Sequence, residues 1–271
     1  MALSLNNYLK DLSYNYYLKK DSYEISRINT SVDNMLSKLD KDFEYLLRKR
    51  FVFGSYSRGT ILSRSIDIKS DVDIMVVFKH SEYERTPETY RAWLKNFADK
   101  NYKDRYGSEV LKSFPTVTVR LNNINFDLVP AKLETNWLNE EKLFIPSKNF
   151  SSNWQETNPY DVKEKLAEVN KKYNYIVKTV IRLMKAWNAK NGYPFDSYDL
   201  EMKVADMNFY NDNYQTGFFY AVNQLSLDWS AAQSKKDKLN SLRYNISKVK
   251  DYLEAYDSTT AKYWLHKVLP Y

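Results

Sequence analysis

Two aspartates separated by one residue, Asp71 and Asp73, stand at the start of an apolar, β-branched run. Residues i and i+2 of a strand point to the same face, so a strand here places two carboxylates side by side. Their mutual repulsion is relieved when a cation lies between them. Because the chain has no cysteine and only two histidines, we expect a hard divalent cation such as Mg²⁺ or Mn²⁺.

A third aspartate, Asp127, lies inside a second apolar segment, between Phe126 and Leu128. A carboxylate with such neighbours needs a partner, because burying an unpaired charge is unfavourable. If the two segments pair as neighbouring strands, three carboxylates converge, which suits a site for two metal ions. In such sites one ion lowers the pKa of an attacking hydroxyl and the other holds a triphosphate and the leaving oxygen.

A Gly54-Ser55 pair directly follows the apolar run Phe51–Phe53 and precedes a stretch rich in hydroxyls. Glycine lets the backbone approach a ligand closely, and successive backbone N–H groups can cradle phosphates. Either signal alone is weak, since Gly-Ser is common at turns and Asp-x-Asp is usually a turn or a solvated edge. Their ordered combination with Asp127 is a much rarer pattern than either signal alone. Arg58, in the same stretch, is either a phosphate ligand or a surface residue.

The hydrophobic period assigns these residues to an α+β fold. Helices are expected within the first fifty residues. The expected strands are residues 51–53, 72–78, 116–121 and 124–129. The later helices are expected near residues 87–103, 198–210, 215–232, 238–256 and 259–268.

Turn and cap residues refine this plan. Asn122-Asn123 is typical of a hairpin turn, and Pro130 is expected to end the following strand. Residues 131–158 are expected to form a connection without regular structure. Asn158 as N-cap and a proline after it predict a long helix that continues through Trp187.

The composition limits the classes of function. The chain has 271 residues and a net charge of +7, from 41 Lys+Arg and 34 Asp+Glu, which fits an anionic ligand such as a nucleotide or RNA. Without cysteine there is no disulfide, no thiol nucleophile and no thiolate zinc site. The longest strongly apolar stretch, Ile74–Phe78, is far too short to span a bilayer. We therefore expect a cytoplasmic protein without a membrane partner.

The segments FVFGSYSRGT, SDVDIMVVF and INFDLVPA resemble the nucleotidyltransferase superfamily of DNA polymerase β, poly(A) polymerase and the CCA-adding enzymes. The Arg-Gly-Thr after Gly-Ser and the Phe-Asp-Leu-Val-Pro-Ala hairpin are most similar to its oligoadenylate-synthase-like branch. That branch holds the bacterial cGAS/DncV-like nucleotidyltransferases of CBASS anti-phage systems. The resemblance covers residues 45–130 strongly and 160–210 more weakly.

The resemblance implies a polymerase-β-like sheet lobe packed against a helical lobe, with the active site in the cleft between them. Residues 1–158 would form the catalytic lobe with its N-terminal helices, and residues 159–271 the nucleotide-binding lobe. Asp71, Asp73 and Asp127 would be the catalytic and metal-binding residues.

Further residues would bind the nucleotide. The resemblance assigns Gly54, Ser55 and Lys185 to the triphosphate, Ser197 to phosphate at a helix start, and Tyr198 to stacking on the base. The alternatives are a solvated Lys185 and a core Tyr198.

One amide is a weaker candidate for reading a base edge. Asn170 lies on the helical face that would look into the cleft, and Asn174, one turn further on, is its equal rival.

The resemblance implies condensation of ATP, GTP, UTP or CTP into a cyclic di- or trinucleotide with release of pyrophosphate, in anti-phage signalling. The product would act on a separate effector protein, and an RNA or a protein would activate synthesis. One alternative is a template-independent RNA 3′-end nucleotidyltransferase of the CCA-adding or poly(A) kind, although no strong positive stripe is visible. Another is an inactive nucleotide-binding partner module, against which the intact carboxylates argue.

Overall fold

The computed structural model describes residues 3–18, 23–80, 82, 84–135, 137, 140–147 and 153–271. The chain folds into two compact units. The helical unit comprises Met1–Lys19, Gly59–Ile68 and Lys165–Tyr271, and the sheet unit comprises Lys20–Arg58 and Lys69–Glu164. The two units are thus interleaved along the chain, whereas the lobes expected from the sequence are consecutive. The assignment of catalysis to residues 1–158 and of nucleotide binding to residues 159–271 stays a prediction.

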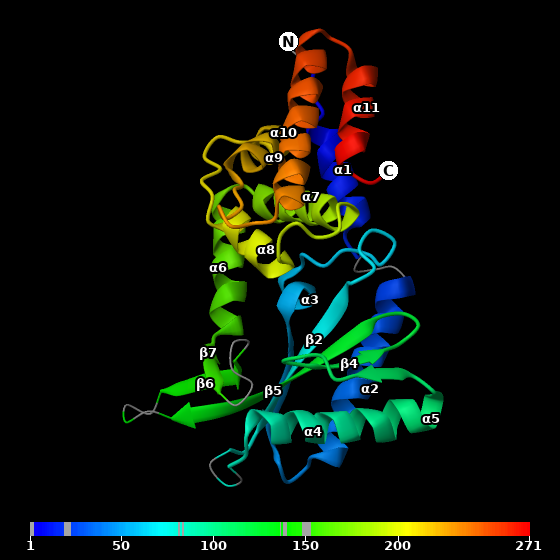
Figure 1. Cartoon of the computed structure of the whole chain (residues 1–271), viewed down its shortest axis with the longest axis vertical. Coiled ribbons are helices and arrows are strands. Elements are labelled where there is room, and N and C mark those ends of the chain that lie inside the picture. The colour runs from blue at the N-terminus through cyan, green and yellow to red at the C-terminus, as the bar shows by residue number, and fades with distance from the viewer. Residues whose placement is uncertain are drawn as a thin grey trace. The chain divides into compact units, whose positions relative to one another are not determined.

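The sheet unit contains a mixed sheet with the strand order β1-β2-β5-β4-β3 (Figure 1). Its strands are β1 (Leu47–Phe53), β2 (Asp71–Phe78), β3 (Glu109–Leu111), β4 (Val117–Arg120), β5 (Asn125–Thr135), β6 (Glu141–Pro146) and β7 (Trp154–Thr157). The β2 and β5 strands pair in parallel, and β4 and β5 form the hairpin predicted around Asn122-Asn123. The predicted strands at 72–78, 116–121 and 124–129 are confirmed.

Two expectations for the sheet are wrong. Strand β5 continues through Pro130, which pairs with Val76 of β2. On the other edge of β5, the pairing with β4 ends at Leu128 and the pairing with β6 begins at Lys132. Pro130 lies in the gap between these two partners, where no strand needs a hydrogen bond from its missing N–H. The expected connection 131–158 also contains β6 and β7, while residues 136, 138–139 and 148–152 of it lie outside the described residues.

The two faces of the sheet differ in chemistry. One face is covered by helices, because Phe78 stacks on Tyr90 of α4 (Pro87–Ala98) with ring centroids 4.6 Å apart. Phe78 also contacts Phe43, which follows helix α2 (Tyr23–Asp42). The other face carries Met75 and Val129 in a small apolar cluster. The helical stretch predicted at 87–103 continues from α4 through a π-helix (Asp99–Lys103) into α5 (Asp104–Tyr106).

The helical unit is built around α7 (Ile176–Lys190), which contacts α1 (Asn6–Tyr16), α8 (Ser197–Ala205) and α9 (Tyr214–Gln224). Helices α10 (Gln233–Glu254) and α11 (Ser258–Val268) pack on each other as a pair (Figure 1). Most of the α7 side chains are buried in one apolar core with leucines of α1. No helix within the described ranges is both long and apolar enough to cross a membrane.

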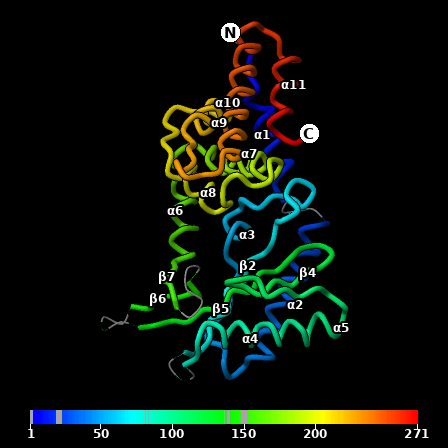
Figure 2. Tube along the Cα trace, in the orientation of Figure 1, coloured from blue at the N-terminus to red at the C-terminus, as the bar shows by residue number. Residues whose placement is uncertain are grey.

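The single helix predicted from Pro159 through Trp187 is in fact two helices. Helix α6 (Pro159–Lys172) ends before Asn174 and Tyr175, both of which have positive φ, and α7 begins at Ile176. Figure 2 shows the chain turning sharply between α6 and α7. Asn170 stabilises this break, because its side-chain Oδ1 accepts a hydrogen bond from the backbone N–H of Lys178 at 3.0 Å. Lys178 is the third residue of α7, so Asn170 caps this helix from α6.

Replacing Asn170 by alanine is expected to lower the free energy of unfolding by about 1 kcal/mol, the usual contribution of a side-chain cap. Chemical denaturation of the purified protein measures this change. The matched variant Asn170→Asp keeps the acceptor oxygen and should lose much less. Equal losses in the two variants would show that the amide serves something other than the cap.

The C-terminal segment is held to the helical unit by partly buried and exposed polar contacts. Tyr8 Oη and His266 Nε2 lie 2.6 Å apart, and Tyr16 Oη donates a hydrogen bond to the carbonyl of Pro270. Lys190 Nζ donates to the carbonyls of His266 (2.7 Å), Lys267 (3.1 Å) and Leu269 (3.1 Å). Burial, and then the nearby charges of Lys190 and Lys262, lower the pKa of His266.

This lowered pKa predicts a loss of stability in mild acid. The fold favours neutral His266, so its contribution is complete above the unfolded pKa of about 6.5 and declines as the pH falls below it. The melting temperature should therefore fall between about pH 7.5 and pH 5.5. His266→Gln should reduce that fall. The pKa of His80 is also lowered, mainly by burial, so His80→Gln measures the share of the fall that comes from the other histidine. An unchanged fall in His266→Gln contradicts the prediction.

Candidate functional site

Asp71, Asp73 and Asp127 lie on one face of the sheet. In the parallel ladder of β2 and β5, Asp73 pairs directly with Asp127, and Asp71 pairs with Asn125. Neighbouring strands are about 4.8 Å apart and paired residues share a face, so the three carboxylates lie on the same face of two adjacent strands. All three side chains are half-buried, whereas the residues between them are buried on the opposite face. The strand pairing on which the predicted site depends is present.

Gly54 brings the predicted phosphate-binding turn directly against these carboxylates. Phe53, the last residue of β1, pairs with Asp73, and Gly54 then opens the short helix α3 (Gly54–Arg58) with a φ of +69°. A Cβ atom on residue 54 would lie 2.7 Å from Cγ of Asp73 and closer still to its Oδ2. Only glycine fits both this backbone conformation and this contact.

Asp127 has a partner that sequence reasoning missed. Thr118 lies opposite Asp127 in the β4–β5 hairpin, and its Oγ1 donates a hydrogen bond of 2.6 Å to Asp127 Oδ1. Burial raises the pKa of Asp127, and the hydrogen bond from Thr118 acts against this rise. A buried carboxylate of this kind gains from a bound cation, which fits the predicted metal site. Counting back across the predicted hairpin turn would have identified Thr118 from the sequence.

The donors present fit hard divalent cations. Three carboxylates on one face offer only oxygen ligands, which Mg²⁺ and Mn²⁺ prefer. Within the part of the chain that the structure describes, no three acidic or imidazole groups are already gathered as a ligand cluster. Asp127 is held toward Thr118, and Asp73 lies against Gly54. The fit therefore rests on the chemistry and the shared face of the three side chains.

Arg58 ends α3 and is only 7% exposed. A buried guanidinium needs polar partners, so the alternative of a solvated surface arginine is wrong. Its place at the end of the turn keeps it among the residues predicted to bind phosphate.

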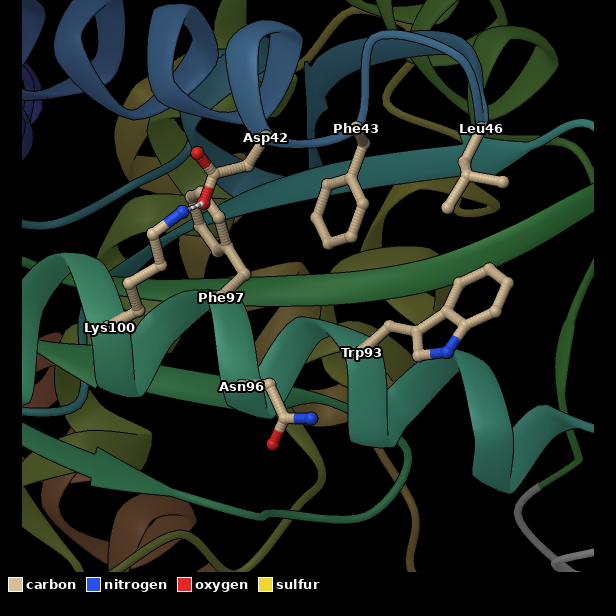
Figure 3. Close-up of a pocket in the computed structure, with 7 residues that line it drawn as sticks. All are labelled: Asp42, Phe43, Leu46, Trp93, Asn96, Phe97 and Lys100. Atoms are coloured by element: carbon tan, nitrogen blue, oxygen red, sulfur yellow. Dashed lines mark hydrogen bonds and ion pairs between the residues drawn. The ribbon is translucent and has the colours of Figure 1, made fainter.

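A cavity of about 270 Å³ in the sheet unit lies elsewhere. The residues that line it come from the end of α2 and the loop after it, from α4 and from the π-helix: Asp42, Phe43, Leu46, Trp93, Asn96, Phe97 and Lys100 (Figure 3). The Leu46 carbonyl accepts a hydrogen bond from Lys79, just after the last residue of β2. Asp73 is near the first residue of β2, and five residues, or about 16 Å of strand, separate it from Phe78 at the other end. The aromatic cavity is therefore distinct from the carboxylate site.

In the helical unit, Lys185 is buried, with 7% exposure, and not solvated. Its Nζ donates to the carbonyl of Thr60 at 3.2 Å and lies 3.9 Å from Glu201 Oε2. One turn earlier on α7, Arg182 Nε donates to the carbonyl of Gly59 at 3.2 Å. Sequence reasoning missed both Arg182 and Glu201, because their partners are remote in the chain.

Ser197 and Tyr198 open helix α8 as predicted, although the helix start is already occupied. Asp196 Oδ1 accepts hydrogen bonds from the backbone N–H groups of Tyr198 (2.9 Å) and Asp199 (3.1 Å). These two N–H groups are therefore already bound, and the predicted role of Ser197 in phosphate binding depends on its hydroxyl. Tyr198 is 47% exposed, so it is not a core aromatic. Asn170, the proposed base reader, uses its Oδ1 to cap α7.

Comparison with known proteins identifies the family. A model described as the Second Messenger Oligonucleotide or Dinucleotide Synthetase (SMODS) domain matches residues 3–170. A cyclic AMP-AMP-AMP synthase from Acinetobacter sp. is 27% identical over 193 residues, which cover 68% of this chain and 53% of that protein. The chain spans about half the length of the curated relatives it matches.

Solved structures share the fold. CdnC of E. coli MS115-1, solved with ATP, has a TM-score of 0.71 at 16% identity, covering 97% of this chain and 96% of that one. The Vibrio cholerae DncV cyclic AMP-GMP synthase, solved with the linear intermediate 5′ pppA(3′,5′)pG, has a TM-score of 0.63 at 11% identity, covering 100% and 81%. The resemblance seen in the motifs is confirmed, and the chain belongs to the family of Second Messenger Oligonucleotide or Dinucleotide Synthetases, the cGAS/DncV-like nucleotidyltransferases.

Proposed function

We propose that this protein is a metal-dependent nucleotidyltransferase that condenses ribonucleoside triphosphates into a cyclic di- or trinucleotide. The observation that carries the proposal is that Asp71, Asp73 and Asp127 share one face of two adjacent strands, with Gly54 packed against Asp73. A phosphate-binding turn beside three carboxylates is what transfer from a triphosphate requires.

The reaction is an in-line attack of a 3′- or 2′-hydroxyl on the α-phosphorus of a nucleoside triphosphate. The new phosphodiester bond forms as the bond to the leaving pyrophosphate breaks. Asp71 and Asp73 would hold two divalent ions, and Asp127 would share the ion on the side of the attacking hydroxyl. Bound ions supply charge neutralisation and a lowered hydroxyl pKa. Asp127, oriented by its hydrogen bond from Thr118, would also accept the hydroxyl proton.

The remaining residues position the substrate. Gly54, Ser55 and Arg58 would bind the triphosphate from the sheet unit. The family resemblance implies that Lys185 and Ser197 also bind the triphosphate.

The nucleobase would be held at the start of α8, by the residue after Ser197. The exposed ring of Tyr198 would stack on it. Positioning and charge neutralisation would then supply most of the rate enhancement.

The relatives guide the choice of product. One curated relative makes cyclic AMP-AMP-AMP, and CdnC was solved with ATP, so ATP is the first substrate to test. The linear intermediate in DncV supports synthesis in successive steps. A second messenger needs a receptor, so we propose a separate effector protein and a role in anti-phage defence in the cytoplasm.

The test is mass spectrometry of products made from the four ribonucleotides with Mg²⁺ or Mn²⁺. A small product resistant to phosphatase, with release of pyrophosphate, is expected. Extension of an added RNA 3′ end would favour the RNA nucleotidyltransferase instead. Nucleotide binding without any product, even with added RNA or lysate protein as activator, would favour the inactive binding module.

A further inference from the structure

Glu201 is a buried carboxylate that the proposed mechanism does not use. It lies one turn into α8, after Ser197 and Tyr198, and is 1% exposed. Its Oε2 accepts a hydrogen bond of 3.0 Å from Thr60 Oγ1 and lies 3.9 Å from Lys185 Nζ. Burying a carboxylate so completely is unfavourable unless a charge partner and hydrogen bonds compensate it.

Lys185, Thr60 and Glu201 close a small network within the helical unit. Lys185 Nζ also donates to the backbone carbonyl of Thr60 at 3.2 Å. The carbonyl and the carboxylate together fix the direction of the ammonium group. A buried ammonium needs a charge partner and hydrogen-bond acceptors, and Glu201 and the Thr60 carbonyl supply them.

Anchoring the chain at Thr60 does not by itself explain this ion pair. Arg182 already holds the neighbouring carbonyl of Gly59 at 3.2 Å, and its guanidinium lies 4.3 Å from the ring centroid of Tyr17. A buried ion pair adds little stability compared with well-packed apolar side chains of similar volume. A charged and directed ammonium is, however, what binding a triphosphate requires.

We infer that Glu201 is a positioning residue for nucleotide binding. It pairs with the Lys185 ammonium and fixes its direction, and it acts on the triphosphate only through Lys185. This inference rests on the proposed function, in which Lys185 contacts the triphosphate.

The test compares Glu201→Gln, Lys185→Met and the double variant by equilibrium binding of a non-hydrolysable ATP analogue. Glutamine keeps the acceptor for Thr60 but removes the charge. We expect binding about tenfold weaker in Glu201→Gln, as for the loss of one charge-assisted interaction. KM for ATP should rise more than kcat falls. In the double variant, binding should be no weaker than in Lys185→Met, because both substitutions remove the same interaction.

The control is Asp206→Asn, which removes an exposed ion pair with Lys165 (2.7 Å) beyond the other end of α8. It should leave nucleotide binding unchanged. Melting temperatures of all variants separate loss of folding from loss of binding. If Glu201→Gln fails to fold, Glu201→Asp keeps the charge but shortens its reach, and a weaker loss of binding is expected.

Unchanged binding in Glu201→Gln, or fully additive losses in the double variant, would overturn the inference. These results are distinguishable from failure of the proposed function. If the wild-type protein makes no product under any condition, the proposed function fails. If it makes product and Glu201→Gln binds nucleotide as the wild type does, only the role of Glu201 fails.

Discussion

Replacing Asp71 and Asp73 together by asparagine is expected to abolish product formation while the protein stays folded. Asparagine keeps the size of each side chain but removes the charges that would hold divalent ions. Because these ions would bind both the attacking hydroxyl and the triphosphate, we expect a loss of at least about a thousandfold. Product is measured by mass spectrometry, and folding by circular dichroism and thermal melting.

The melting temperature gives an independent check of the geometry. Asp71, Asp73 and Asp127 share one face, so removing two charges relieves repulsion when no divalent ion is present. The double variant should thus melt at the same temperature as the wild type in EDTA, or higher. Glu109→Gln, on edge strand β3, removes an exposed carboxylate as a control and should keep full activity. Substantial activity in the double variant would refute the mechanism.

Gly54→Ala should have the second largest effect, with loss of most activity and of stability. The alanine Cβ would lie 2.7 Å from Cγ of Asp73, so either the turn or the carboxylate must move. The φ of +69° adds backbone strain of about 1–3 kcal/mol for a residue with a side chain. A displaced Asp73 or phosphate turn should reduce kcat/KM by at least about a hundredfold.

Gly107 provides a matched control in the same unit. Its φ of +68° is nearly the same, but a Cβ there meets nothing within 4 Å. Gly107→Ala therefore carries the backbone strain without the contact, and it should lose stability but retain activity. Chemical denaturation and steady-state kinetics of both variants separate the two causes. If Gly54→Ala behaves like Gly107→Ala in both assays, the close approach to Asp73 has no functional role.

The carboxylate site could be predicted because strands alternate with a period of two. Asp71 and Asp73 must share a face of any strand, and the hairpin turn at Asn122-Asn123 fixes the register that carries Asp127. The sequence does not determine that β2 and β5 pair in parallel. This pairing depends on contacts between segments about fifty residues apart, which alternation cannot specify.

The features that the sequence did not predict have different physical causes. Thr60 and Glu201 are separated by 141 residues, and no local pattern connects them. The break between α6 and α7 contains neither glycine nor proline, and it is stabilised by Asn170 from the preceding helix. Strands β6 and β7 were missed because they are short, and β6 completes its pairing on the extension of β5 beyond Pro130.

The interleaving of the two units has a consequence for dissecting the protein into fragments. A fragment of residues 159–271 would lack both α1 and the Gly59–Ile68 stretch of the helical unit. It would leave the apolar side of α7 uncovered and would deprive Arg182 and Lys185 of the carbonyls they bind. Such a fragment should aggregate or stay unfolded, and co-expression with the complementary fragment 1–158 should restore its solubility. In this fold, removing either half of the gene removes part of both units.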